Sequence, residues 1–346
     1  MTKGTDWDNY IEVVSKNEYV QYKRIKKIAV MHGREKWVGG VYDKGSIYGI
    51  ANCSNCVLKI DTIGQACQEI GNIDDNNNEF RWTGGCSYRG KIYGLPRSEN
   101  SLLVIDGINY EVSTVPLQIS YLTEHHYAGV MIPEGIVYQP PRESETILKI
   151  NLNTYEAMEI LMPAPIRGNR YCGSVLHPNG NIYFFPDGEG YVISFDSKTE
   201  EINVFEQKIF SRIYSPCVAK DGNIYGYNIK NGLLKFDVNK RQVEILFDDI
   251  EMGCYGCVIG LNGNVYGIVG SGNIIFEYSI GNQKLNQLFK IEEKNSVKCA
   301  GAGIDQYGNI YMIPAKGDYI YVLEVDQLNA DINEFYPENR FFNNNY

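Results

Sequence analysis

Short runs in which hydrophobic and polar residues alternate recur along the chain, separated by Gly, Asn and Asp. A period of two that is rich in Ile, Val and Tyr predicts β-strands, because amphipathic helices repeat every 3.6 residues instead. One phrase, Gly-x-Ile-Tyr, recurs with Val replacing Ile twice. Its tyrosines are spaced by 45, 45, 45, 42, 41 and 45 residues, at Tyr48, Tyr93, Tyr138, Tyr183, Tyr225, Tyr266 and Tyr311. The chain therefore contains seven related β-units.

A glycine lies three residues before each of these tyrosines. In three units the glycine follows Asn or Asp, as in Asp221-Gly222, and apolar runs flank the pair. Such pairs suit the positive φ angles of a tight hairpin turn. Each Gly-x-Ile-Tyr phrase is therefore predicted to open the second strand of a hairpin.

Two more strands complete each unit. The third is apolar and ends in Asp or Asn in most units, a residue type whose side chain bonds backbone amides in turns. The predicted third strands are residues 57–61, 103–106, 147–151, 192–196, 234–237, 275–278 and 322–326. A more polar fourth strand follows, as in residues 242–247, which suits an outer edge. Four short strands in about 44 residues form one propeller blade, so the sequence predicts an all-β, seven-bladed β-propeller of four-stranded antiparallel blades.

Two segments compete to close the ring. Residues 19–30 resemble a fourth strand without its preceding three, and could complete the last blade. Residues 328–336 could fill the same place, but the N-terminal strand is favoured because it leads directly into the first blade. We expect an N-terminal segment with the closing strand at 1–35, the propeller at 36–336 and a C-terminal tail at 337–346.

The repeat resembles those of the propellers grouped with kelch, the NHL class and the streptogramin lyases, over residues 36 to about 335. Kelch blades carry a diglycine directly after the Ile-Tyr strand, whereas this chain has Gly49-Ile50 and Gly94-Leu95 there. Its diglycines lie one strand earlier, at Gly39-Gly40 and Gly84-Gly85. The chain thus departs from the kelch motif, and kelch partners do not carry over. The resemblance to streptogramin lyases implies a His and Glu with a metal near the channel, but that motif has no residue-by-residue match here.

Each innermost strand begins at an anchor residue that repeats as regularly as the glycine. The seven anchors are Trp37, Trp82, Tyr127, Tyr171, Tyr214, Tyr255 and Cys299, and the first six of them are aromatic. The loops that lead into the inner strands of a propeller lie at one mouth of its channel. The seven anchors are therefore predicted to form a ring at that mouth.

Cations precede most anchors, at Lys36, Arg81, Arg170 and Lys298, with His126 before Tyr127. The loops after the second strands add Arg97, Arg142, Lys230 and Lys316. Arginine suits bidentate contact with carboxylate or phosphate, and aromatic rings supply flat apolar surface. These residues predict a pocket for an anionic or aromatic ligand or an acidic peptide. The alternative is that the aromatic residues pack between blades and the cations are solvated or paired with acids.

Candidate catalytic chemistry is sparse. His126 is the one histidine of four that falls in the predicted ring, where it could act as a base or a metal ligand. Two Cys-x-x-Cys pairs, at Cys53 and Cys254, belong to different blades and blade positions, so free buried cysteine is the expectation. No nucleophile elbow, phosphate loop or zinc-protease motif occurs. We therefore predict no cofactor, and a divalent metal only if the protein is an enzyme.

The chain of 346 residues has a net charge of −10, which argues against nucleic acid and anionic membranes as partners. Nine cysteines and a polar N-terminal stretch favour a reducing cytoplasm. We expect a monomeric binding module that uses the mouth for a small ligand or a protein partner. The alternatives are a lyase or hydrolase resembling the streptogramin lyases, with chemistry near His126, and a scaffold that recognises partners on a blade edge or side.

Overall fold

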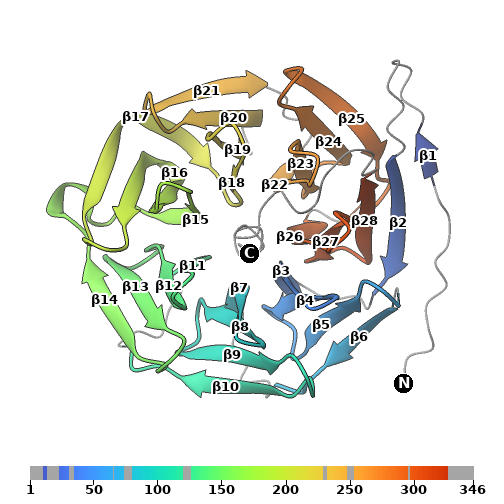
Figure 1. The fold of residues 1–346 in the computed structure, drawn as a ribbon, viewed down its shortest axis with the longest axis horizontal. Helices are drawn as coiled ribbons and strands as arrows, with labels where there is room; N and C mark the ends of the chain where they lie inside the picture. Colours follow the sequence, from blue (N-terminus) through green and yellow to red (C-terminus); the bar gives the residue numbers. More distant parts are fainter. Residues whose placement is uncertain are drawn as a thin grey trace.

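The computed structural model describes residues 11–13, 23–30, 35–64, 66–73, 80–119, 126–228, 232–247, 253–294 and 297–325. Seven antiparallel sheets are arranged in a ring around a central axis, with their strands stacked from the centre outward (Figure 1). This arrangement confirms the predicted all-β, seven-bladed propeller. In the described residues the one helical element is a single 3-10 turn, η1 (Ala164–Ile166).

The first three blades each contain four strands in the order predicted from the repeat. Blade 1 comprises β3 (Trp37–Asp43), β4 (Ser46–Ala51), β5 (Val57–Asp61) and β6 (Ala66–Ile70). Blade 2 comprises β7 (Trp82–Tyr88), β8 (Lys91–Pro96), β9 (Ser101–Asp106) and β10 (Val112–Pro116). Blade 3 comprises β11 (Val130–Ile132), β12 (Ile136–Gln139), β13 (Thr146–Asn151) and β14 (Ala157–Leu161).

Blade 4 departs from this plan. After β15 (Tyr171–Leu176), the second and third strands run together as the 16-residue β16 (Asn181–Asp196). The outer strand β17 (Ile202–Arg212) has 11 residues and pairs with β16 as far as Asp187↔Arg212. The extension of β17 therefore carries Arg212 alongside the link between the second and third strands.

The remaining blades return to four strands. Blade 5 comprises β18 (Cys217–Val218), β19 (Ile224–Asn228), β20 (Gly232–Asp237) and β21 (Gln242–Phe247). Blade 6 comprises β22 (Cys254–Ile259), β23 (Val265–Val269), β24 (Ile274–Ser279) and β25 (Lys284–Lys290). Blade 7 contains β26 (Cys299–Ile304), β27 (Ile310–Pro314) and β28 (Tyr319–Val325) from the C-terminal half.

An N-terminal strand closes the ring, as predicted. The strand β2 (Lys23–Ala29) pairs with β28 from Lys23↔Val325 to Ala29↔Tyr319, and so becomes the fourth strand of blade 7. A short strand, β1 (Ile11–Val13), adds to the outer edge of β2. The rival segment 328–336, the tail and residues 19–22 lie outside the described residues.

The end of each blade that carries the turns after the first and third strands, here called the turn end, has the geometry that the repeat predicts. All seven repeat glycines have positive φ, between 77° and 90°, at Gly45, Gly90, Gly135, Gly180, Gly222, Gly263 and Gly308. The tyrosines that follow them are each at most 3% exposed. After the third strand, Asp61 and Asp106 accept hydrogen bonds from two backbone amides each, at distances of 2.8–3.1 Å. These bonds confirm the predicted role of the recurring Asp in turn formation.

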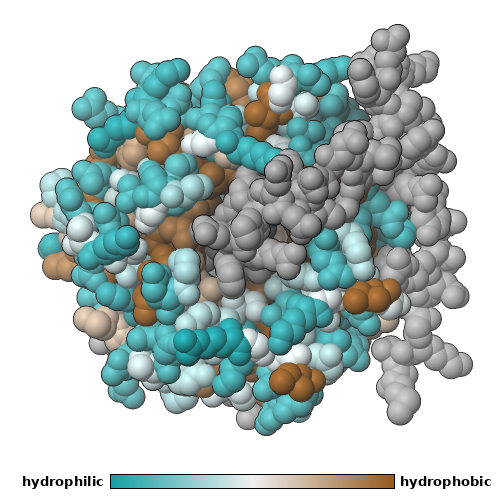
Figure 2. Space-filling view, viewed as in Figure 1, coloured by the Kyte–Doolittle hydropathy of each residue, from teal (hydrophilic) through white to brown (hydrophobic). Residues whose placement is uncertain are grey.

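The core consists of apolar layers between neighbouring blades rather than one central cluster. Close to the axis the blades touch through their backbones, since a Cβ on Gly40 would lie 2.5 Å from the Gly303 nitrogen. The face in Figure 2 is mostly hydrophilic, with one recessed hydrophobic region left of the centre and single hydrophobic residues elsewhere on the surface. No helix among the described residues is long and apolar enough to cross a membrane.

Candidate functional site

The predicted mouth residues lie at one end of each blade. Strand register pairs the anchors with the ends of the second strands, as in Trp37↔Ala51, Trp82↔Pro96 and Tyr171↔Pro186. In four blades, the residue that directly follows this end of the second strand donates its backbone N–H to the carbonyl of the cation before the anchor, at 2.8–2.9 Å. These pairs are Asn52–Lys36, Arg97–Arg81, Asp187–Arg170 and Ala315–Lys298. The cations before the anchors and the residues after the second strands therefore lie on the same face of the ring, as predicted.

Three of the predicted cations connect neighbouring blades. The Lys36 ammonium donates to the Gly317 carbonyl at 2.7 Å, and the Lys298 ammonium donates to the Gly272 carbonyl at 3.0 Å. The Arg81 guanidinium donates to the Ser54 carbonyl. Each carbonyl belongs to the preceding blade, and the three cations are residues that are at most 5% exposed. We therefore assign these three side chains to the stability of the ring rather than to ligand binding.

Arg170 also contacts the preceding blade, but its side chain stays at the surface. Its guanidinium pairs with the Glu143 carboxylate at 2.6 Å, with both side chains almost half exposed. His126 instead contacts its own blade: its Nε2 lies 2.9 Å from the Thr146 carbonyl. A carbonyl oxygen only accepts, so Nε2 carries the proton and donates it there. This 5% exposed imidazole holds its own loop, and its catalytic role stays a prediction.

Three anchors are enclosed between blades. Trp37 and Trp82 are each 1% exposed, and their indoles donate to the carbonyls of Cys56 and Ser101 at 2.9 and 2.8 Å. Tyr171 is fully buried in the layer between blades 3 and 4. These aromatic residues form part of the inter-blade core. The other aromatic anchors, Tyr127, Tyr214 and Tyr255, lie together.

Tyr127 is the centre of a cluster of arginines. The Arg97 guanidinium carbon lies 5.0 Å from the Tyr127 ring centre, and that of Arg142 lies 4.9 Å away. Arg97 also lies 4.3 Å from the ring centre of Phe80. Burial raises the pKa of the Tyr127 hydroxyl, against the opposing effect of the two arginines, so the ring stays neutral beneath them.

A buried carboxylate connects this cluster to a third arginine. The side chain of Asp187 is 1% exposed, and its oxygens lie 3.4 Å from Arg142 Nε and 2.7 Å from Arg212 Nε. The Arg142 side chain is 13% exposed and that of Arg212 is 50% exposed. Asp187 therefore holds two guanidinium groups at the mouth, one partly enclosed and one in contact with solvent.

Two stacked tyrosines complete the site. The rings of Tyr214 and Tyr255 lie 5.3 Å apart at an angle of 14°, and Tyr127 lies 6.0 Å from Tyr214. A Cβ at Gly270 would come 1.9 Å from the Tyr255 ring, so this ring lies against a glycine. Arg212 Nη1 donates to the Tyr214 hydroxyl at 3.3 Å. Both tyrosines are partly exposed, so the stack presents flat surface next to the arginines.

The sequence analysis missed Phe80, Asp187 and Arg212. Asp187 lies four residues after a repeat tyrosine, the position that holds Arg97 and Arg142 in blades 2 and 3. A comparison of that position across the blades would have found it. Arg212 had no such signal, because it reaches the mouth through the unusual length of β17.

Other candidate groups lie apart from this cluster. Lys316 pairs with Glu35 at 3.2 Å, and Lys230 falls outside the described residues. The nine cysteines, all within the described ranges, form no disulfide, and burial raises the pKa of Cys254 well above its usual value. Across the part of the chain that the structure describes, no three His, Cys, Asp or Glu side chains gather in a way that could hold a metal.

Comparisons with known proteins identify the fold. No known protein-family model matches the sequence, and no curated protein matches it. Among solved structures, a streptogramin B lyase superposes with a TM-score of 0.74 at 11% identity, over 88% of this chain and 98% of the other. A virginiamycin B lyase from Staphylococcus aureus gives 0.73 at 14% identity, over 88% and 100%. The WD40 propeller domain of Doa1 gives 0.64 at 9% identity, over 85% and 95%. At such identities the shared property is the architecture: this chain is a seven-bladed β-propeller similar in fold to streptogramin lyases and WD40 domains.

Proposed function

We propose that this protein is a ligand-binding propeller whose mouth, over blades 2 to 6, takes a small anion with a flat aromatic part. The observation that carries the proposal is the convergence of Arg97, Arg142 and Arg212 with the stacked rings of Tyr214 and Tyr255. Guanidinium groups bind carboxylate or phosphate through paired hydrogen bonds, and tyrosine rings bind planar groups through their faces. A ligand that carries both groups would use the whole cluster.

The surroundings favour such a ligand over a bare ion. Arg142 is mostly enclosed, so an anion at this guanidinium would be partly removed from water, where charge-assisted hydrogen bonds gain strength. Asp187 fixes the direction of Arg142 and Arg212 before any ligand arrives. Binding to a site that is already ordered costs less side-chain entropy.

Titration calorimetry with defined probes tests the proposal. We expect benzoate, phthalate or phenyl phosphate to bind the wild-type protein more tightly than acetate or inorganic phosphate. Arg142→Ala and Arg212→Ala should each weaken binding by roughly 10-fold or more, as expected when a charged hydrogen-bond partner is lost. The control is Arg89→Ala, which changes an exposed arginine in the β7–β8 turn. If no probe binds, or if all three variants bind alike, the proposal is wrong.

A further inference from the structure

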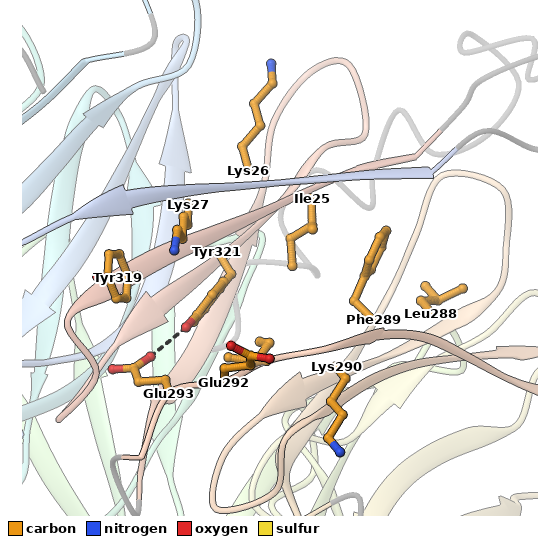
Figure 3. A pocket seen from close by; sticks show the side chains of 11 residues that line it. Ile25, Lys26, Lys27, Leu288, Phe289, Lys290, Glu292, Glu293, Tyr319 and Tyr321 are labelled. Carbon is orange, nitrogen blue, oxygen red and sulfur yellow. Dashed lines mark hydrogen bonds between the residues drawn. The ribbon is translucent and has the colours of Figure 1, made fainter. Parts of the chain in front are cut away.

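A pocket of about 550 Å³ opens between the outer strands of blades 6 and 7 (Figure 3). Its walls come from β2, from β25 with the residues just after it, and from β28. These segments are far apart in the sequence and meet only because β2 closes the ring. The volume lies within the range of pockets that bind ligands or side chains.

The floor of this pocket is apolar and fixed. Ile25, Phe289, Ile291 and Tyr321 are each 4–7% exposed and belong to one core cluster. The Tyr321 hydroxyl donates to Glu293 Oε2 at 2.6 Å, which Figure 3 shows as a dashed line. The other oxygen, Glu293 Oε1, accepts the Asp318 N–H, also at 2.6 Å. These bonds hold one wall in place, so the cavity is part of the folded structure.

The corresponding groove between blades 4 and 5 is bridged. The Gln207 side chain donates to the Val243 carbonyl at 3.1 Å and accepts the Val243 N–H at 2.8 Å. Arg241 donates to the Val204 carbonyl at 2.9 Å and lies over the Phe205 ring. Side chains of the two outer strands thus join across that groove, whereas the groove between blades 6 and 7 holds a cavity.

Two exposed lysines face this pocket from opposite walls. A third lysine of the lining, Lys26, is buried and pairs with Glu324 instead. Lys27 is exposed beside the Tyr319 ring, 4.8 Å from its centre, and Lys290 is exposed on the opposite wall. Glu292 is exposed nearby, whereas both oxygens of Glu293 accept internal hydrogen bonds. Lys27 and Lys290 are therefore the two groups that acidic side chains of a partner would contact.

The strand beside the pocket can pair with another chain. β25 is the outermost strand of blade 6, and an edge strand presents a row of backbone N–H and C=O groups. An extended peptide that pairs with such an edge places alternate side chains on one face. A side chain on the inner face of that peptide would enter the pocket.

We infer that the groove between blades 6 and 7 is a docking site for an extended acidic segment of a partner protein, with one aliphatic side chain in the pocket. Backbone pairing with β25 supplies the direction of the segment. The floor of Ile25, Phe289 and Tyr321 receives the aliphatic group, and Lys27 and Lys290 attract the acidic flanks. No residue of the proposed anion site lines this pocket, so the inference is independent of the function proposed there.

Fluorescence anisotropy tests this inference with a labelled octapeptide that has a central Leu-Leu pair and three acidic residues on each side. We expect micromolar binding that weakens as salt rises, because charge steers the peptide. The double variant Lys27→Glu/Lys290→Glu should raise Kd at least 10-fold, and the same peptide with Ser-Ser at its centre should also bind at least 10-fold more weakly. Leu288→Asp should weaken binding by placing a charge in the apolar wall.

Matched controls separate this site from charge effects and from the mouth. Lys198→Glu, which reverses an exposed charge in blade 4, and Arg142→Ala at the mouth should both leave peptide binding unchanged. Hydrogen exchange should show protection of β25 when the peptide is bound. The inference is wrong if the peptide does not bind, if the Ser-Ser peptide binds equally well, or if the Lys27 and Lys290 reversals have no effect.

Discussion

The cations at the two sides of the mouth make different contacts. In blades 7, 1 and 2, the residue before the anchor is a buried cation, and each donates to a backbone carbonyl of the preceding blade. In blades 2 to 4, Arg97, Arg142 and Arg212 instead lie against Tyr127 or beside Asp187. The first side is a set of clamps between blades, and the second is a cluster in contact with solvent.

The two sides also differ in how regular the lengths of their strands are. The inner strands of blades 1, 2, 6 and 7 have six or seven residues, whereas β11 has three and β18 has two. Blade 4 has the merged strand β16. In the regular blades the residues before the anchors serve packing. In the irregular blades 3 to 5, Tyr127, Arg142, Asp187, Arg212 and Tyr214 meet, and the neighbouring regular blades add Arg97 and Tyr255. This is the side on which we propose that the ligand binds.

The largest expected effect comes from a change in the regular part of a blade. Gly222 has φ +78° and open space where a Cβ would lie, so a side chain there is opposed by the backbone alone. We expect Gly222→Val to lower the free energy of unfolding by about 2 kcal/mol, because a β-branched residue resists positive φ. Gly281→Val is the matched control, since Gly281 also has open space but no positive φ. Urea unfolding would measure both, and equal stabilities would refute the turn argument.

A smaller loss of stability is expected when one of the hydrogen bonds between neighbouring blades is removed. Lys298→Ala removes the hydrogen bond to the Gly272 carbonyl in a residue that is 1% exposed. We expect a loss of about 1.5–2 kcal/mol of stability, typical of a buried bond from a charged donor. Binding of aromatic anions at the mouth should be unchanged once the protein is folded.

The same experiment on the cluster of arginines around Tyr127 should give the reverse result. Arg97→Ala should change stability by less than about 1 kcal/mol, typical of a partly exposed side chain, and should weaken aromatic anion binding. Chemical denaturation and calorimetry on both variants provide the measurement. If Lys298→Ala abolished binding while Arg97→Ala did not, the assignment of the two sides would have to be exchanged.

The fold could be predicted from the sequence because the repeat encodes local geometry. Each blade repeats the same glycine at positive φ and the same buried tyrosine, so a single pattern predicts seven hairpins. Ring closure followed from finding one strand-like segment without partners before the first blade. The merging of strands in blade 4 could not be predicted, because it depends on pairing between β16 and an extended β17.

The site was predictable only in part, since sequence position gives the face of the ring but not the burial of a side chain. Trp82 and Tyr127 occupy equivalent positions, yet Trp82 lies in an inter-blade layer and Tyr127 lies beneath two arginines. The tyrosine spacing gave one hint, because it shortens from 45 to 42 and 41 residues after Tyr183 and Tyr225. These shorter units belong to the irregular side of the mouth.

The smallest expected effect concerns the turn end of the blades, which should behave alike on both sides. Backbone amides of Ile108 and Asn109 lower the pKa of Asp106, and those of Lys198 and Thr199 lower the pKa of Asp196 in irregular blade 4. A carboxyl whose pKa is lower in the folded state stabilises the fold above its unfolded value of about 3.9. That contribution disappears as the pH falls through the folded-state pKa.

Thermal unfolding between pH 7 and pH 2 would show this dependence as a falling midpoint below about pH 4. Asp106→Asn and Asp196→Asn should each keep nearly wild-type stability at pH 7, since Asn151 accepts the equivalent amide bond in blade 3 at 2.9 Å. Each variant should lose slightly less stability in acid than the wild type, and by the same amount. A larger change for Asp196 than for Asp106 would mean that the irregularity of blade 4 extends from the mouth to the turn end, and that the two sides of the ring differ throughout their height.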